Sequence, residues 1–244
     1  MEFRVIIPAR YASTRLPGKP LVKIKGKYLI EHIYRSASDS DASEVIIATD
    51  DEKIEEIAIN FGAKVVMTSV QHKSGTDRIA EAVNILGYQD DQIVVNVQGD
   101  EFGLQSDLIN TVAESLHKNN KANIATLSEK IVDIKTYHDQ HSVKVVVDKY
   151  NHALYFSRSP IPWIKGIEKF ERSVIFKHIG IYAYQSGFLK KYASLPSNML
   201  EKEESLEQLR ALYNGYKIYV KLVDEKKGIE INTEEDLKRA RNAL

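Results

Sequence analysis

Short runs of apolar, largely β-branched residues alternate along the first half of the chain with segments whose apolar residues recur at helical spacing. The runs cover residues 3–7, 44–50, 64–68 and 92–97. The helical spacing covers residues 29–37, 51–63 and 77–86, as is typical of helices with one buried face. Because the runs are apolar almost throughout, we expect strands of a parallel sheet that helices cover on both faces.

The second half of the chain has a different pattern. Apolar runs at residues 144–148 and 152–159 are separated by Lys-Tyr-Asn, which predicts a hairpin. Further strands are expected at 178–184 and 217–223, and helices at 206–213 and from 232 onwards, where Thr233 and Asp236 resemble a capping box. We therefore predict a single domain over residues 1–244. It is an α/β fold with three layers (α/β/α), a mixed, mostly parallel sheet and an inserted β-rich lobe at about residues 130–190.

The composition narrows the classes of function. A chain of 244 residues can bury a sizeable core, and it contains no cysteine, which excludes disulfides and thiolate metal sites. Lys+Arg and Asp+Glu both total 34, so net charge gives no reason to expect a nucleic acid partner. No apolar run approaches the ~20 residues of a membrane span, and the first residues lack a signal-peptide pattern. We expect a cytoplasmic protein without a membrane partner.

A loop with three cations follows the first predicted strand. Residues 8–21 read PARYASTRLPGKPL and contain Arg10, Arg15 and Lys19. The prolines stiffen this loop, and three cations suit the roughly four negative charges of a nucleoside triphosphate. It is not a Walker A loop, because Pro20 stands where Ser or Thr is needed. A solvated surface loop whose arginines pair with nearby acids is the alternative.

Two more polar stretches lie where open α/β sheets bind ligands, beyond the carboxyl ends of strands. HKSGTDR (72–78) opens a helix, whose N–H groups suit a base or phosphate together with the hydroxyls of Ser74 and Thr76; the alternative is an N-cap loop. VNVQGDE (95–101) ends at Asp100, which suits Mg²⁺, since this ion takes one or two carboxylates and leaves the rest to phosphate and water. A turn-forming Gly-Asp pair is the alternative.

A fourth set of polar residues is scattered over the second half of the chain. Taken one at a time, each has an ordinary structural explanation. Together they form a small polar pocket with one cation for a carboxylate, and they are Arg158, His178, Tyr182, Glu207 and Gln208. The nearby aromatic residues are interpreted as the core of the β-rich lobe, and they are Tyr155, Phe156 and Trp163.

Six stretches resemble, in order and nearly from end to end, the 3-deoxy-manno-octulosonate cytidylyltransferases, the CMP-Kdo synthetases of Gram-negative lipopolysaccharide biosynthesis. They are PARYASTRLPGKPL, HKSGTDR, NVQGDE, ALYFSRSPIPW, HIGIYAY and LEQLR. The resemblance implies a nucleotide-diphospho-sugar transferase-like fold and a homodimer, with the lobe as the dimerisation surface. It also implies a magnesium-dependent reaction in which CTP and the sugar acid give a CMP-sugar and pyrophosphate.

The resemblance implies a role for each motif. The implied CTP site comprises Ala9, Arg10, Arg15, Lys19, Ser74, Gly75, Thr76 and Arg78. The implied sugar-acid site comprises Gln98, Arg158, His178, Tyr182, Glu207 and Gln208. Asp100 is the implied metal ligand, and the implied catalytic residues are Lys19, Arg15 and Asp100. Attack of the sugar hydroxyl on the α-phosphorus needs mainly positioning and charge neutralisation, and no side chain stands out as an obligatory general base.

The chain departs from the family pattern at several positions. Asn232 stands where the family has a second metal-binding Asp, and Glu230 is the alternative ligand two residues earlier. Phe102 replaces a proline and Gln185 a basic residue. A cation lost near the pocket would suit the family branch that acts on 8-amino-3,8-dideoxy-manno-octulosonate, whose amine carries a positive charge. Plain Kdo, another nucleotidyltransferase substrate and a non-catalytic nucleotide-binding protein are the alternatives.

Overall fold

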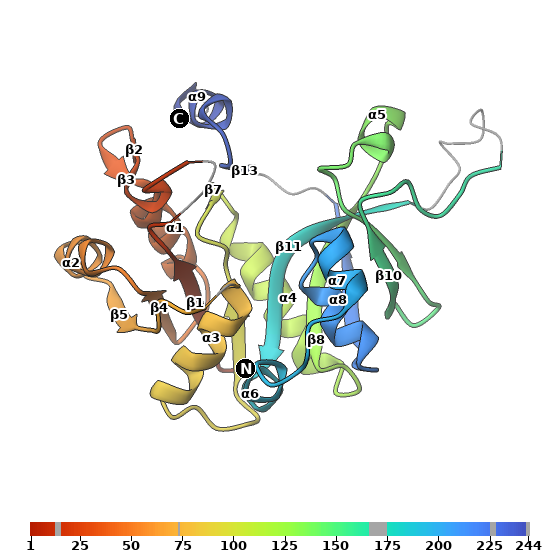
Figure 1. Cartoon of the computed structure of the whole chain (residues 1–244), viewed down its shortest axis with the longest axis horizontal. Helices are drawn as coiled ribbons and strands as arrows, with labels where there is room; N and C mark the ends of the chain where they lie inside the picture. Colours follow the sequence, from red (N-terminus) through yellow and green to blue (C-terminus); the bar gives the residue numbers. More distant parts are fainter. Residues whose placement is uncertain (13–15, 73, 166–174, 225–227, 243–244) are drawn as a thin grey trace.

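Four parallel strands form the first half of the main sheet. The computed structural model describes residues 1–12, 16–72, 74–165, 175–224 and 228–242. The strands lie side by side in the order β5, β4, β1, β6 (Figure 1) and comprise Lys64–Met67, Glu44–Thr49, Phe3–Ala9 and Ile93–Asn96. All pair in parallel, as the apolar runs predict.

Helices cover both faces of this sheet, which makes the three layers of the predicted fold. On one face lie α1 (Leu29–Ser38), α2 (Glu52–Asn60) and α4 (Ser106–Lys118). On the other lie α3 (Gly75–Ile85) and α6 (Ser186–Tyr192). Strand β1 shows the cause, because Val5 and Ile7 pack into one core and Ile6 into the other. Each fully buried side chain of this kind contributes about 1.5–3 kcal/mol relative to exposure.

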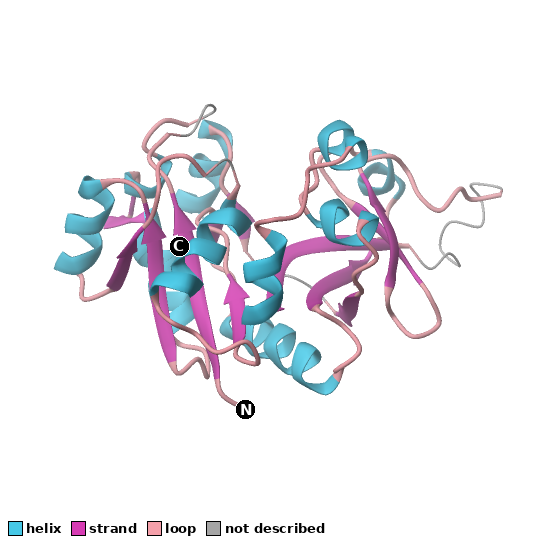
Figure 2. Ribbon diagram, turned by 60° about the horizontal axis from the view of Figure 1, so that its bottom comes forward, coloured by secondary structure: helices cyan, strands magenta, loops and turns pink. Residues whose placement is uncertain are grey.

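The second half of the sheet is built around one long strand. Strand β11 (Phe176–Gln185) pairs antiparallel with β6 and with β8 (Ile124–Lys130), and β12 (Ile218–Val223) pairs in parallel with β8. The register of β11 against β8 shifts between Ile179 and Tyr182. The first residues of β11 also pair with β9 (Lys144–Val147), which forms a hairpin with β10 (Ala153–Ser157). The β-rich lobe is therefore an extension of the main sheet (Figure 2).

The remaining elements are short and surround the ends of the sheet. They are the 3-10 helix Lys19–Leu21, β2 (Lys23–Ile24), β3 (Lys27–Tyr28), β7 (Glu101–Phe102), α5 (Ile134–His138), α7 (Met199–Glu204), α8 (Gln208–Tyr213), β13 (Ile229–Glu230) and α9 (Glu234–Asn242). Figure 1 shows α9, β7 and β13 together at one end of the parallel strands, and α5 beside the lobe.

The predicted aromatic core of the lobe is correct for Phe156 and wrong for Trp163. Phe156 is buried in the core shared with α8, as expected, whereas Trp163 is 80 % exposed and is not part of the lobe core. In the part of the chain that the structure describes, no helix has the length and apolar character needed to cross a membrane.

Candidate active site

The carboxyl ends of β1 and β6 and the first turn of α3 border one cleft, of about 230 Å³. Gly99 explains how the loop after β6 reaches β1. A Cβ atom there would lie 2.7 Å from the Pro8 carbonyl oxygen, so any other residue would displace backbone. Most of the predicted CTP site lines this cleft, namely Ala9, Arg10, Lys19, Ser74, Gly75 and Arg78. Arg15 lies outside the described residues.

Lys19 joins two segments that are far apart in the sequence. Its ammonium group donates hydrogen bonds to Asp100 Oδ2 at 2.7 Å, to the Ile231 carbonyl at 2.9 Å and to Asn232 Oδ1 at 3.3 Å. The backbone brings these acceptors together, because β7 pairs with β13 and the Ile231 N–H donates to the Asp100 carbonyl at 2.9 Å. Asn232 Nδ2 donates to Glu230 Oε1 at 2.5 Å, which orients the amide oxygen towards Lys19.

Asp100 and Asn232 supply oxygen atoms that suit a hard cation. Because Lys19 Nζ contacts both oxygens, one cation can lie between them. Across the described ranges, no group of three or more His, Asp or Glu side chains is arranged to hold a metal. Mg²⁺ fits such a small donor set, since it usually keeps water and substrate phosphates as its other ligands. The residues present therefore fit a magnesium ion that shares its coordination with a nucleotide.

Side chains of the predicted CTP site fix the first turn of α3. Ser74 is its N-cap, and the Ser74 hydroxyl accepts a hydrogen bond from the Asp77 N–H at 3.0 Å. Arg78 is 2 % exposed and donates to Asp50 Oδ2 at 2.7 Å and to Thr68 Oγ1 at 2.6 Å. Arg78 therefore ties α3 to the ends of β4 and β5, and the start of α3 offers backbone N–H groups to an anion.

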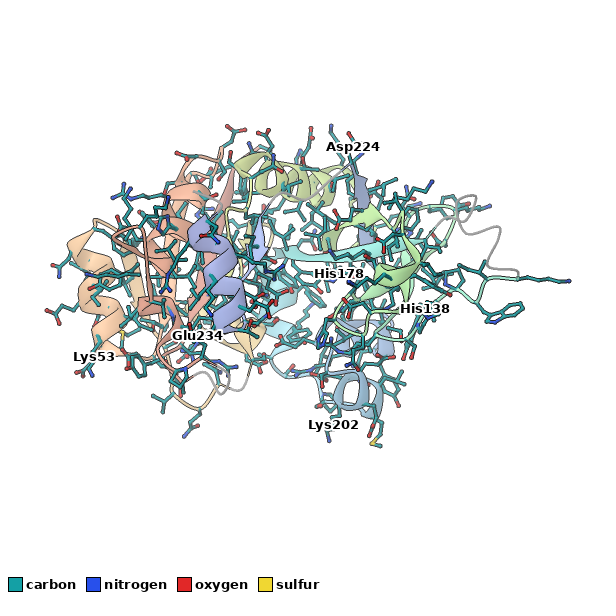
Figure 3. The ribbon with its side chains drawn as sticks, turned by 90° about the horizontal axis from the view of Figure 1, so that it is seen from above. Lys53, His138, His178, Lys202, Asp224 and Glu234 are labelled. Atoms are coloured by element: carbon teal, nitrogen blue, oxygen red, sulfur yellow. The ribbon has the colours of Figure 1, made fainter. Side chains whose placement is uncertain are left out.

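A second cleft, of about 580 Å³, lies beside the first. All six residues of the predicted sugar-acid site line it, namely Gln98, Arg158, His178, Tyr182, Glu207 and Gln208. Thr76, predicted at the CTP site, lines this second cleft. Seen from above, His178 on β11 lies between α9, which carries Glu234, and α5, which carries His138 (Figure 3). The two clefts share four lining residues, namely Gln98, Asp100, Glu207 and Asn232. Ligands in the two clefts would therefore meet beside Asp100.

Arg158 and His178 line the second cleft and contact neutral groups. Arg158 donates from Nε to the Glu204 carbonyl at 2.7 Å and from a terminal nitrogen to the Gln140 carbonyl at 3.1 Å. His178 Nε2 lies 2.9 Å from the Thr126 hydroxyl. Because these partners carry no formal charge, the guanidinium of Arg158 keeps its positive charge available to a ligand.

Glu207 lies at the junction of the clefts and has a perturbed pKa. Its Oε2 accepts a hydrogen bond from the Thr76 hydroxyl at 2.7 Å. Burial raises the pKa of Glu207, and the charge of Asp77 raises it further, whereas the hydrogen bond from Thr76 lowers it. The neighbouring Gln208 is 8 % exposed, and its Nε2 has no hydrogen-bond partner among the described residues. A buried donor of this kind is satisfied when a ligand acceptor occupies the cleft.

Several lining residues were missed by the sequence reasoning. His72 lines the first cleft and lies 2.5 Å from Glu81 Oε2; its place in the HKSGTDR motif was the available signal. Glu101 and Glu129 line the second cleft, and Lys177 Nζ lies 3.1 Å from Glu129 Oε1. No motif carries the last two, because they face one another across paired strands β8 and β11.

Comparisons with known proteins agree with this geometry. The family model described as cytidylyltransferase matches residues 4–218. A 3-deoxy-manno-octulosonate cytidylyltransferase of Coxiella burnetii is 48% identical over 99% of both chains. Its counterpart in Haemophilus influenzae is 47% identical over 100% of this chain and 99% of its own. A solved CMP:2-keto-3-deoxy-manno-octonic acid synthetase in complex with CTP has a TM-score of 0.90 at 39% identity, covering 99% of this chain and 97% of the other.

Proposed function

The chain belongs to the family of 3-deoxy-manno-octulosonate cytidylyltransferases, and we propose that it transfers CMP from CTP to an eight-carbon 2-keto-3-deoxy sugar acid. The two clefts that meet beside Asp100 are the observation that carries this proposal. Such an arrangement places a nucleotide in one cleft next to a sugar acid in the other, which is what a direct transfer between them requires.

The reaction needs little covalent chemistry from the protein. The anomeric hydroxyl oxygen of the sugar acid forms a bond to the α-phosphorus of CTP, the bond from that phosphorus to the bridging oxygen of the β-phosphate breaks, and the hydroxyl proton leaves to solvent. Pyrophosphate departs with the bonding electrons. Lys19 and Arg10 line the first cleft and stabilise this negative charge. Arg158 and Gln208 orient the sugar acid in the second cleft.

We assign the metal site to Asp100 and Asn232, with Mg²⁺ as the ion that their oxygen atoms suit. When bound there, Mg²⁺ lowers the pKa of the attacking hydroxyl and neutralises phosphate oxygens. With a cation held by these two oxygens, the flexible side chain of Lys19 would be available to pair with phosphate.

The finer choice of substrate is 8-amino-3,8-dideoxy-manno-octulosonate. Two of the sequence departures do not bear on it, because Phe102 and Gln185 are not among the residues that line the second cleft. The support comes instead from three carboxylates that do line it, on Glu101, Glu129 and Glu230, which outnumber the ammonium group of Lys177 that pairs with Glu129. An ammonium group on the substrate would be attracted by such a wall, whereas a hydroxyl group gains much less from it.

Side-by-side turnover of the two sugar acids tests both levels of the proposal. Pyrophosphate release is measured with CTP and Mg²⁺ and with either Kdo or its 8-amino analogue. We expect a higher kcat/KM for the amino sugar. Equal values, or a preference for Kdo, would remove the amino-sugar preference and keep the cytidylyltransferase. Absence of pyrophosphate release with every eight- or nine-carbon 2-keto sugar acid would leave a non-catalytic nucleotide-binding protein.

We further propose a cytoplasmic homodimer formed through the lobe. Tyr150, Leu154 and Trp163 expose between 61 and 80 % of their area on the lobe, and a group of large exposed apolar side chains is typical of an interface. A cytoplasmic location follows from the use of CTP, which is made inside the cell. Sedimentation of the wild type and of Leu154→Asp tests the dimer: we expect the variant to sediment as a monomer, and a monomeric wild type would contradict the proposal.

A further inference from the structure

We propose that Lys144, a buried lysine outside both predicted sites, is a positioning residue that holds Arg158 and its neighbouring loop in place to bind the carboxylate of the sugar acid. The proposal rests on the proposed function, because it takes a sugar acid as the ligand of the second cleft. It concerns a residue that touches neither substrate, since Lys144 lines neither cleft.

Lys144 is bonded entirely to backbone carbonyl groups. It lies on β9 with no measurable exposure, although lysine is among the residues least often buried in this way. Its ammonium group donates to the carbonyl oxygens of Asp139 at 2.8 Å, Ser142 at 2.5 Å and Arg158 at 2.6 Å. One side chain therefore fixes both ends of the loop 139–142 and the end of β10.

Arg158 completes the same arrangement from the other side. Its guanidinium donates to the carbonyl oxygens of Gln140, Glu204 and Ser205. Gln140 lies in the loop that Lys144 holds, and the Arg158 N–H donates to Glu204 Oε2 at 2.8 Å. These three guanidinium bonds use three of its five N–H groups, so the others can meet a bidentate anion such as a carboxylate. His141, in the same loop, lines the second cleft with Arg158.

The electrostatics of this arrangement favour an anion. Burial lowers the pKa of Lys144, and the charges of Asp139 and Glu204 partly oppose that effect while the charge of Arg158 adds to it. Two cations that are close enough to repel one another are costly to keep in a folded chain. The carboxylates of Asp139 and Glu204 offset part of this repulsion, and a bound carboxylate would pair with the guanidinium of Arg158 directly.

The test measures kcat and KM for each substrate in the wild type, Lys144→Met, Arg158→Gln and the double variant. We expect Lys144→Met to raise the KM for the sugar acid about tenfold or more, while the KM for CTP stays within about twofold. The double variant should match Arg158→Gln within about twofold, because a residue that acts through Arg158 has nothing left to position. Lys190→Met is the matched control. Lys190 also donates to a backbone carbonyl, that of Tyr88 at 2.8 Å, and lines neither cleft.

Three results would overturn the proposal: an unchanged KM for the sugar acid, an equal rise in both KM values, or effects of the two substitutions that simply add. Folding of each variant is checked by circular dichroism. If Lys144→Met does not fold, Lys144→Gln, whose shorter side chain has two N–H donors in place of three, is measured against the same criteria. A wild type without activity on any sugar acid overturns the proposed function, whereas an active wild type with an unaffected Lys144→Met overturns this inference alone.

Discussion

Lys19 and Arg158, the cations that we propose for the two ligands, are held by different kinds of partner. In the first cleft, Lys19 is bonded to the carboxylate of Asp100 and Arg78 to that of Asp50, at 2.7 Å in each case. On the lobe side of the second cleft, Arg158 is bonded to carbonyl oxygens, as is the buried Lys144 behind it. The first cleft therefore pairs Lys19 and Arg78 with carboxylates, whereas the second orients the guanidinium of Arg158 by carbonyl oxygens and pairs Lys177 with Glu129.

The difference matches the ligands that we propose for the two regions. In the proposed function, a nucleotide would bring a cation for Asp100, and Lys19 would be available to pair with phosphate. A sugar acid brings a single carboxylate and no counter-ion. Among the described residues, the guanidinium of Arg158 contacts carbonyl oxygens, so it can bind this carboxylate without first breaking an ion pair. We predict the effects of four substitutions at these two sites and present them in order of decreasing size.

Asp100→Ala should have the largest effect. The carboxylate is lost from the proposed metal site, and Lys19 keeps its charge without its partner. We expect kcat to fall by about a thousandfold or more, as when a metal ligand worth several kcal/mol of transition-state stabilisation is removed. Pyrophosphate release measures it. The control is Asp90→Ala, an exposed carboxylate paired with Lys190. Near-normal turnover in Asp100→Ala would mean that this carboxylate does not hold the metal.

Arg78→Met should lower the stability of the fold and weaken the binding of CTP. The substitution leaves the Asp50 carboxylate without its buried partner, and we expect the free energy of unfolding to fall by about 3 kcal/mol. The KM for CTP should rise, because α3 is no longer tied to β4, while the KM for the sugar acid stays unchanged. Urea denaturation and the two KM values provide the measurements. Restored stability in Asp50→Asn/Arg78→Met would identify the ion pair as the cause, and an unchanged stability in Arg78→Met would contradict it.

Glu207→Gln should stabilise the protein and weaken its activity. The folded-state pKa of Glu207 is raised above its ordinary value of 4.5, so its charged form is disfavoured in the fold. Its contribution to stability is fully present below pH 4.5 and is lost as pH rises through the raised pKa. A glutamine stays neutral, so the melting temperature of the variant should exceed that of the wild type at pH 7 and match it below pH 4.5.

The activity of Glu207→Gln completes that prediction. We expect kcat/KM for the sugar acid to fall about tenfold, since a charged hydrogen-bond partner is lost from the second cleft. Thermal melts at both pH values and steady-state kinetics give the readouts. A variant that melts below the wild type at pH 7 would show that the carboxylate is not strained by its surroundings.

Asn232→Asp should have the smallest effect. The substitution adds a second negative charge next to Lys19, which lies 3.3 Å from the amide oxygen. Because Mg²⁺ prefers carboxylates, we expect the concentration that gives half the maximal rate to fall several-fold. Titration of the rate with MgCl₂ measures this. An identical dependence in both proteins would rule out contact between this position and the metal.

The parallel half of the fold follows directly from local sequence. Its strands are buried on both faces, so their residues are apolar almost without interruption. The starts of helices can also be predicted from local sequence, because capping is a short-range interaction. Asp51 accepts hydrogen bonds from the N–H groups of Lys53 and Ile54, and the predicted capping box pairs Thr233 with Asp236.

The antiparallel half was predicted less completely. Strand β8 and helix α4 were missed, and β8 shows why. It buries Thr126 and Ser128 at central positions, so its sequence lacks the apolar run of a buried strand. The Thr126 hydroxyl is satisfied by the Ile181 carbonyl at 2.7 Å, a partner 55 residues away. A tertiary contact of that range is invisible to any local pattern.

The candidate site shows the same division. The stretches at strand ends lie at one edge of the sheet, as the topology of parallel strands predicts. The partners of their side chains were not predicted. Lys19 was expected to bind phosphate, and its contacts with Asp100 and Asn232 span 81 and 213 residues. Lys144 escaped notice because nothing in Val-Lys-Val-Val indicates a charged group with zero exposure.

The long strand β11 limits how this protein can be divided. Its first residues pair with β9, and its last four pair with β6. A designer who wished to exchange the lobe for that of a relative would have to cut within this strand, on one side or the other of the register shift near Gly180. Either cut would separate the residues of β11 that pair with β9 from those that pair with β6, and would interrupt a strand that pairs with β8 on both sides of the shift. New substrate preferences are therefore better introduced by single replacements on the cleft wall than by grafting whole segments.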